Sequence, residues 1–484
     1  MNHSGLSKSE RAQLGTAIAR IGNPWMVGHN YGRVVPIYVL HNLLRARGTS
    51  SPDRLHALKS LAVDPNVDAA KLDLPVAARI QSGLNSLIRG TLAPDGRVFR
   101  NRRAGGASQG GALLPVLPTI VESTVSDDGL GRRLHELLAL SCVREEWDRR
   151  VSRLLTPASI TDPVTNLAAV LTEYSLDEPH EVAEAQEARS SETQANALDR
   201  SIARFMTTLL RNYEEGSRPY AVQQVGIAAY LMAIVRLLNG PLVSPDEPIP
   251  ATMVFTGMPP GSSQDPLVSH AITSLRSTVH RSWIAMVDAI ANHLDDQEPL
   301  PGSDLRSRRR QQLRLALANN RFRASHWEAL GHLVADLPED ELGDARKFSS
   351  AILERGLDFG APTIIQRFRS LAANIGFVAP DRGAGQPRLV LDTPLLGILV
   401  AGTVEGDALE YGQFVTQLRR RVGLIVGVGD NHEFLRDLEG SRLQPANLFQ
   451  VLHESEEELK RRLLRAGLAR TYSDSITEVI RDGL

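Results

Sequence analysis

The chain has 484 residues and a net charge of −2, and 42% of its residues are hydrophobic. A chain of this length is too long to fold around one hydrophobic core, and we expect about three domains. Cys142 is the only cysteine, which excludes an intramolecular disulfide and a cysteine-based zinc site. We find no apolar run of about 18 residues, so no membrane span is expected. The first residues lack the layout of a secretory signal, and we expect a cytoplasmic protein.

The charge is divided unevenly along the chain. Residues 1–103 hold 15 basic and 6 acidic side chains, a net charge of +9, whereas residues 104–300 sum to −11. Residues 301–388 sum to +4 and residues 389–484 to −4. Long helical proteins show such blocks on solvated faces. A basic end beside an acidic middle fits better a nucleic-acid contact at that end and protein contacts elsewhere.

The first 103 residues have the segment order of a winged helix. They contain an apolar run over 34–44, a second helix opened by 49–53, a third helix over 75–89, and two short strands around a turn over 92–99. In a winged helix the third helix enters the major groove and the wing touches the backbone. The predicted DNA contacts on that helix are Arg79, Gln81, Asn85 and Arg89, and those on or after the wing are Arg97, Arg100, Arg102 and Arg103. Winged helices also serve as protein–protein modules, with solvated basic residues.

A glycine-rich stretch, residues 104–111, is predicted to be a flexible linker. The acidic domain that follows, 112–300, is predicted to be helical because apolar residues recur at helical spacing. The expected helices cover 130–155, 163–175, 198–213, 220–238 and 267–294. Residues 240–264 are rich in proline and glycine and are predicted to be a loop. Its length favours a role in a partner contact.

The next domain, 301–391, begins with a basic helix over 305–314. Its arginines either track phosphates, together with Arg321 and Arg323, or form a solvated helix face. Helices are also expected over 327–335 and 362–375, and residues 377–391 are typical of a strand, a turn and a strand. This order repeats that of 75–99 and predicts a second winged helix around 320–391. Its predicted DNA contacts are Arg367, Arg369, Arg382 and Arg388.

The C-terminal domain, 392–484, is predicted to be mostly helical. Its expected helices cover 394–400, 408–422 and 448–467, and residues 468–472 are strand-like. A third winged helix is left open here. The predicted fold class is therefore mainly α, with winged-helix (α+β) modules at the N-terminus and around 320–391, a helical middle domain and a helical C-terminal part.

No motif predicts catalysis. Residues 423–433 look at first like a phosphate loop, yet the chain has no Gly-Lys-Ser/Thr sequence, and the third glycine of a dinucleotide site is missing. Asp430, His432 and Glu433 offer metal ligands, but three polar residues in a turn are usually just a turn. Cys142 sits among apolar neighbours, which favours packing over a nucleophilic role. We expect no enzymatic activity, no cofactor and no metal.

In organisation the chain resembles accessory proteins of bacterial anti-phage and DNA-modification loci, including those of the deazaguanine DNA-modification cluster. The likeness lies in a basic N-terminal winged helix, a long helical middle and a helical C-terminal part, and no functional residue transfers from it. It implies a non-catalytic component that binds double-stranded DNA and positions an ATPase, helicase or nuclease partner encoded nearby. A homodimer is left open.

Two alternatives remain. The chain is also similar to the kleisin-type subunit of bacterial chromosome-condensing or plasmid-restricting complexes, which has winged helices at both ends of a helical middle and binds motor ATPases. The other alternative is a transcription regulator, for which a ligand pocket or a dimer coiled coil would be expected; the sequence gives no strong sign of either.

Overall fold

The computed structural model describes residues 6–28, 39–40, 43, 129–140, 143–155, 196–213, 218–239, 253–254, 266–297, 304–318, 320, 322–379, 388–427, 445–472 and 476–481. Helices dominate these residues and their strands form small sheets, which confirms the mainly α prediction. In this part of the chain, no helix has the length and apolar character that a membrane crossing requires.

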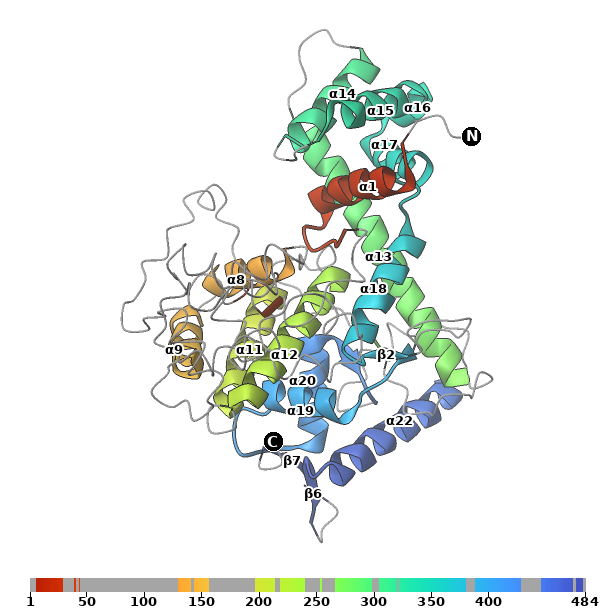
Figure 1. The fold of residues 1–484 in the computed structure, drawn as a ribbon. Helices are drawn as coiled ribbons and strands as arrows, with labels where there is room; N and C mark the ends of the chain where they lie inside the picture. Colours follow the sequence, from red (N-terminus) through yellow and green to blue (C-terminus); the bar gives the residue numbers. More distant parts are fainter. Residues whose placement is uncertain are drawn as a thin grey trace, which may run out of the picture.

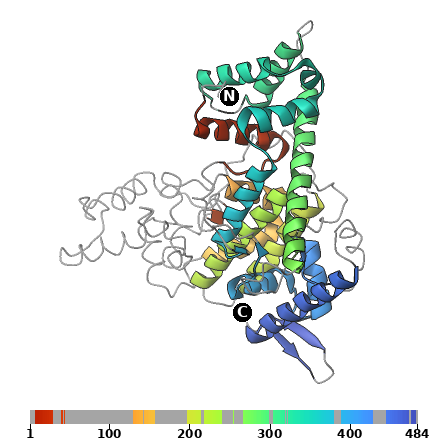
Figure 2. The ribbon, with the colours of Figure 1, turned by 90° about the vertical axis from the view of Figure 1, so that its right-hand side faces the viewer.

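Helix α13 (Pro266–Asp295) runs between two groups of helices (Figures 1 and 2). Its 30 residues give it a length of about 45 Å. Buried side chains recur along it at helical spacing: Leu275, Val279, Trp283, Met286, Ile290 and Leu294. We call the helices around its C-terminal end the head and those packed along the rest of it the body. The helix predicted over 267–294 is confirmed.

The head combines segments from distant parts of the sequence. It contains α1 (Lys8–Gly22), α14 (Leu305–Ala316), α15 (Ala324–Ala335), α16 (Glu339–Gly343), α17 (Ala345–Ala351) and the π-helical turn η9 (Ile352–Gly356). Helix α1 begins with a capping box, in which the Ser7 hydroxyl accepts from the Glu10 amide and the Glu10 carboxylate accepts from the Ser7 amide. The predicted helices over 305–314 and 327–335 are both present.

The N-terminal segment packs directly against α13. At Gly22 a β-carbon would lie 2.2 Å from the Met286 carbonyl oxygen, so only glycine allows this approach of the two helices. The Asn23 side chain donates to the carbonyl of Leu237, 2.9 Å away in the body. Residues 6–28 therefore share their core with the head and the body, and the domain predicted over 1–103 does not stand apart at this end.

The body is built on two helices with many buried residues, α11 (Ala197–Tyr213) and α12 (Arg218–Asn239), which match the predicted helices over 198–213 and 220–238. The single helix predicted over 130–155 is two helices, α8 (Leu130–Leu140) and α9 (Arg144–Leu155). Two glutamates stand in the first turn of α9, where they favour a new helix N-terminus. The helix predicted over 163–175 and the linker over 104–111 lie outside the described residues.

A short strand interrupts the loop predicted over 240–264. Strand β1 (Met253–Val254) pairs in parallel with β5 (Leu424–Ile425). The proline and glycine content of the loop gave no sign of this pairing, because the partner lies about 170 residues further along the chain. The segment is thereby joined to the C-terminal part through backbone hydrogen bonds.

Helix α18 (Ala361–Asn374) leads into an antiparallel hairpin of β2 (Val378–Ala379) and β3 (Arg388–Leu389). The two strands predicted within 377–391 are confirmed, and the turn between them lies outside the described residues. Helix α18 packs against both α12 and α13, so more than one of its faces is covered by other helices of the body.

The C-terminal unit comprises α19 (Thr393–Thr403), β4 (Ala408–Glu410), α20 (Tyr411–Val422), α22 (Pro445–Arg465), β6 (Ala469–Thr471) and β7 (Thr477–Ile480), together with β5. Strands β4, β7 and β6 form an antiparallel sheet in that spatial order. The first three residues of the helix predicted over 408–422 form strand β4 instead, because they pair with the last strand of the chain. The helix itself, α20, begins at Tyr411. The strand-like end at 468–472 is confirmed as β6.

Candidate nucleic-acid interface

Most of the predicted DNA contacts lie outside the described residues. This holds for all eight residues of the first module, Arg79, Gln81, Asn85, Arg89, Arg97, Arg100, Arg102 and Arg103, and for Arg382. Arg388 lies in strand β3 opposite Ala379, and nothing is described of its side chain. These contacts stay predictions.

Arg367 is a structural residue, and the prediction that it contacts DNA is wrong. Its side chain is 2% exposed. One terminal nitrogen donates to the carbonyl of Val27, and the guanidinium lies 4.5 Å over the ring of Phe359. It therefore joins α18 to the N-terminal segment, in a site that a phosphate cannot reach. Arg369, on the next part of α18, is half-buried.

A set of exposed arginines lies instead on α14, at the outer end of the head (Figure 1). We call it the α14 arginine face; its members are Arg306, Arg308, Arg310 and Arg314, all exposed. Arg306, Arg310 and Arg314 follow one another at intervals of four residues, so they lie on one side of the helix with about 6 Å between neighbours along its axis. This places the three arginines in a row along the helix, with the Arg310 guanidinium turned toward the Gly331 carbonyl of α15.

Arg309, in the same run, points the other way. Its Nε donates to the Leu342 carbonyl at 2.9 Å, and its Nη1 donates to the carboxylate of Asp295 and the amide oxygen of Gln312, both at 2.9 Å. The guanidinium also lies 5.4 Å from the Phe348 ring centre. Sequence reasoning did not separate Arg309 from its neighbours. The signal was the four-residue spacing of Arg309, Leu313 and Leu317, which places the arginine on the apolar side.

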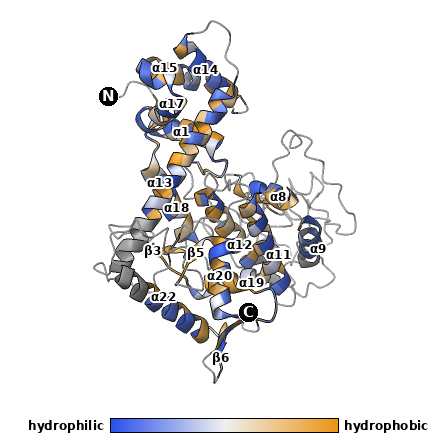
Figure 3. Cartoon of the chain, turned by 180° about the vertical axis from the view of Figure 1, so that it is seen from behind, coloured by the Kyte–Doolittle hydropathy of each residue, from blue (hydrophilic) through white to orange (hydrophobic). Residues whose placement is uncertain are grey.

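The C-terminal unit has a different surface. The described side chains of α22 include four glutamates, at 454, 456, 457 and 458, and four basic residues, at 460, 461, 462 and 465, and polar and apolar positions mix along the helix (Figure 3). Beyond it, the β6–β7 hairpin exposes about half of Tyr472 and of Ile476. The two residues face each other across the hairpin, since the Tyr472 amide donates to the Ile476 carbonyl. This surface is balanced in charge and partly apolar.

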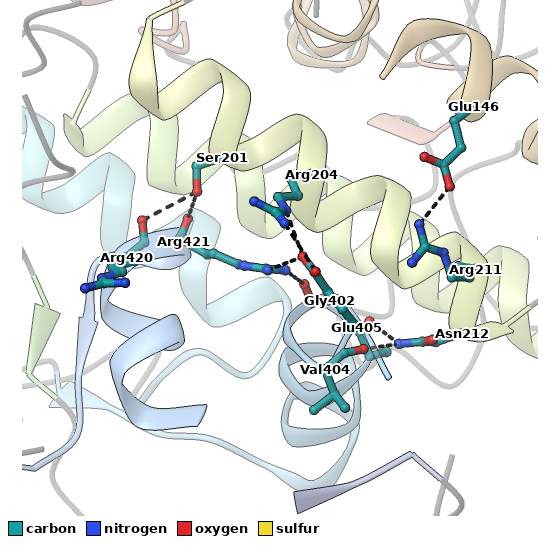
Figure 4. A network of polar contacts seen from close by, with 11 residues as sticks. Glu146, Ser201, Arg204, Arg211, Asn212, Gly402, Val404, Glu405, Arg420 and Arg421 are labelled. Atoms are coloured by element: carbon teal, nitrogen blue, oxygen red, sulfur yellow. Dashed lines mark hydrogen bonds and ion pairs between the residues drawn. The ribbon is translucent and has the colours of Figure 1, made fainter. Parts of the chain in front are cut away.

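A polar network joins the C-terminal unit to α11 (Figure 4). Glu405 accepts hydrogen bonds from Arg204, at 2.7 Å, and from Arg421. Burial acts to raise the pKa of Glu405, but the two arginines outweigh burial and the pKa is lowered. Arg421 also donates to the Gly402 carbonyl at 3.0 Å, and its own pKa is lowered by burial. These bonds stabilise the junction and leave no reactive group.

The same junction is closely packed. Helix α19 approaches α11 so closely that a β-carbon at Gly402 would lie 2.3 Å from the ring of Phe205. About two turns further along α11, the Asn212 amide donates to the carbonyls of Ala401 and Val404, at 2.8 and 2.7 Å (Figure 4). These bonds satisfy the C-terminal carbonyls of α19. The C-terminal unit is thereby held in one position against the body.

Among the residues that the structure describes, no group of three or more His, Cys, Asp or Glu side chains is placed to hold a metal ion. Cys142, Asp430, His432 and Glu433 lie outside these residues. Comparison of the chain with protein-family models, with curated proteins and with solved structures found no match. Charge, exposure and element order are thus the properties that bear on function.

Proposed function

We propose that the chain is a non-catalytic DNA-binding component of a multi-protein bacterial complex, which positions an ATPase, helicase or nuclease on double-stranded DNA. The observation that carries the proposal is the element order of the C-terminal unit. From α19 to β7 the described elements read helix, strand, helix, strand, helix, strand, strand; β4 pairs with β7, and β5 pairs outside the unit with β1. With β5 set aside, we interpret this order as that of a winged helix, with α22 in the place of the groove-binding helix.

For residues 34–99 the sequence predicts an apolar run, two further helices and two short strands, and these residues carry +3 of the +9 net charge of residues 1–103. A chain with winged-helix order at both ends and a strong positive charge at one of them fits a DNA contact at the basic end. The balanced charge of α22 and the exposed Tyr472 and Ile476 fit a protein contact at the other end. The anti-phage setting is supported by the resemblance in organisation alone.

The unit around 320–391 supports the proposal less. Its helix α18 is followed by the β2–β3 hairpin, as in a winged helix, but α18 packs against α12 and α13 and buries Arg367. A helix enclosed on these sides does not enter a major groove. We therefore assign DNA binding to the first module and leave this unit a structural role.

The test is a binding titration of the full chain with a labelled duplex, followed by fluorescence anisotropy. One variant replaces the four arginines on or after the predicted wing, Arg97, Arg100, Arg102 and Arg103, with glutamine. Its control replaces four exposed arginines of the C-terminal unit, Arg420, Arg461, Arg465 and Arg470. Loss of binding by the first variant alone supports the proposal. Failure of the wild-type chain to bind duplex at about 50 mM salt, where phosphate contacts are strong, contradicts it.

The surface of the C-terminal unit also favours the kleisin-like alternative. A helix with balanced charge and a hairpin with exposed apolar side chains are better suited to contact a motor ATPase than to contact a phosphate backbone. The two functions differ in one measurement. A kleisin-like chain keeps its ATPase partner when Tyr472 and Ile476 are intact and loses it when both are changed to serine, whether or not DNA is present.

A further inference from the structure

The charge of the head is divided between two parts of its sequence. Residues 305–323 contain seven arginines and no acidic residue, whereas residues 324–360 contain three basic and eight acidic residues. The first part is α14 and the turn that follows it. The stretch that contains α14 therefore has a positive charge that no acidic residue within the stretch balances.

Helix α14 differs from other helices of the chain in the side chains available to pair with its arginines. In α8, α9 and α22 an arginine pairs with a carboxylate one turn away: Arg132 with Glu136, Arg150 with Glu146, and Arg462 with Glu458. Arginines four residues apart occur on α14, 306 with 310 and 310 with 314, and also on α22, 461 with 465. Helix α14 differs in that it contains no acidic residue to pair with them. Like charges at this spacing destabilise a helix. A bound polyanion would offset this repulsion, which no carboxylate of the helix itself offsets.

The row is held in place by the buried side of the same helix. Arg309 bonds to α13, to α16 and to Gln312, as described above, and Asp304 caps the helix by accepting from the Ser307 amide at 2.9 Å. One N–H of Arg310 donates to the Gly331 carbonyl, and a guanidinium has five N–H donors in all. The exposed arginines thus stand on a fixed helix.

The geometry favours a linear polyanion over a protein. Protein interfaces centre on buried apolar or aromatic residues. The exposed leucines of α14, Leu305 and Leu315, stand at opposite ends of the helix and off the side shared by Arg306, Arg310 and Arg314, by the 100° step of the helix. A row of positive charges about 6 Å apart without a central apolar contact suits a phosphate backbone.

We propose that the α14 arginine face is a second phosphate-binding surface, which contacts the DNA backbone outside the site of the first module. The proposal rests on the proposed DNA-binding function. It assigns to the head a part in holding DNA that is independent of sequence, because phosphate contacts carry no base information. The affinity of the full chain then depends on charges about 200 residues away from the predicted groove helix.

The test uses the full chain and a labelled duplex of about 60 base pairs, long enough for backbone contacts beyond one module. The variant combines Arg306→Gln with Arg314→Gln. Its matched control combines Arg346→Gln with Lys347→Gln, which removes the same charge from two exposed residues of α17 in the same head. We expect the variant to bind at least about fivefold more weakly at about 100 mM salt, and its log–log salt slope to be smaller by about 1.8. The control should match the wild type, and thermal melting should be unchanged in both.

Each other outcome decides the matter. If the wild-type chain binds duplex and the variant binds equally well, the α14 face is a solvated surface and only this inference fails. If the wild-type chain does not bind duplex at all, the proposed function fails and this inference with it. If the variant keeps its DNA affinity and instead loses an acidic protein partner, the face is a protein-binding surface and the inference is overturned.

Discussion

Replacing Arg367 with glutamine should destabilise the N-terminal segment without altering DNA binding by the folded chain. The substitution removes the buried cation that donates to the Val27 carbonyl and stacks on Phe359. Loss of a hydrogen bond from a charged donor costs about 1.5–3 kcal/mol, and the contact with the ring adds about 0.5–1 kcal/mol. We therefore expect the free energy of opening of this segment to fall by about 2–4 kcal/mol.

Hydrogen exchange is the appropriate assay, because a chain of several domains need not unfold in one transition, whereas amide exchange reports local opening. The amides of residues 14–27 should exchange about 30- to 1,000-fold faster in the variant, which is the same free energy expressed as a rate ratio. Arg369→Gln, two residues along the same helix, is the control and should have a smaller effect. Unchanged exchange combined with weaker DNA binding in Arg367→Gln would refute the structural role.

Other consequences concern the junction with the C-terminal unit and the chemistry of the chain. Gly402→Ala should lower stability by about 1–3 kcal/mol despite the better helix propensity of alanine, because its β-carbon meets the Phe205 ring; adding Phe205→Leu should recover part of the loss in a urea titration. Glu405 has a lowered pKa in the folded state, so its contribution is present above about pH 4.3 and is lost as the pH falls through the folded pKa; an acid titration of Glu405→Gln should show a flatter loss of stability. Deleting residues 244–264 removes β1 and its pairing with β5, so the deletion should lower the melting temperature, and an unchanged melt would show that this pairing is dispensable. The purified chain should neither hydrolyse ATP nor cleave DNA, and an activity that co-purifies through several columns would show that catalytic residues have been overlooked.

Local patterns in the sequence predicted most helices, because the apolar spacing of α11, α12 and α13 matches burial on one core. The short strands β1 and β4 were missed for a physical reason. Each is a strand only through a partner far along the chain, Leu424–Ile425 for β1 and 478–480 for β4. Composition in a short window contains no information about such a partner.

The candidate site was harder to predict than the fold. Arg367 looks in sequence like its exposed neighbours, and only tertiary packing shows that it bonds a buried carbonyl. For Arg309 the four-residue spacing with Leu313 and Leu317 was a signal that the sequence analysis did not use. The role of residues 6–28 was also hidden, since their contact with Met286 depends on the absence of a side chain at Gly22. Charge along the sequence is the basis on which DNA is proposed as the partner, and packing determines which of these charges are exposed.

The salt dependence of duplex binding by the unmodified full-length chain tests the central claim most directly. If basic residues of the first module and of α14 contact phosphates, five or more contacts should give a log–log slope of about −4.5 or steeper between about 50 and 200 mM salt. A slope near zero, or no binding at the lowest salt concentration, would contradict the account of this chain as a DNA-binding component.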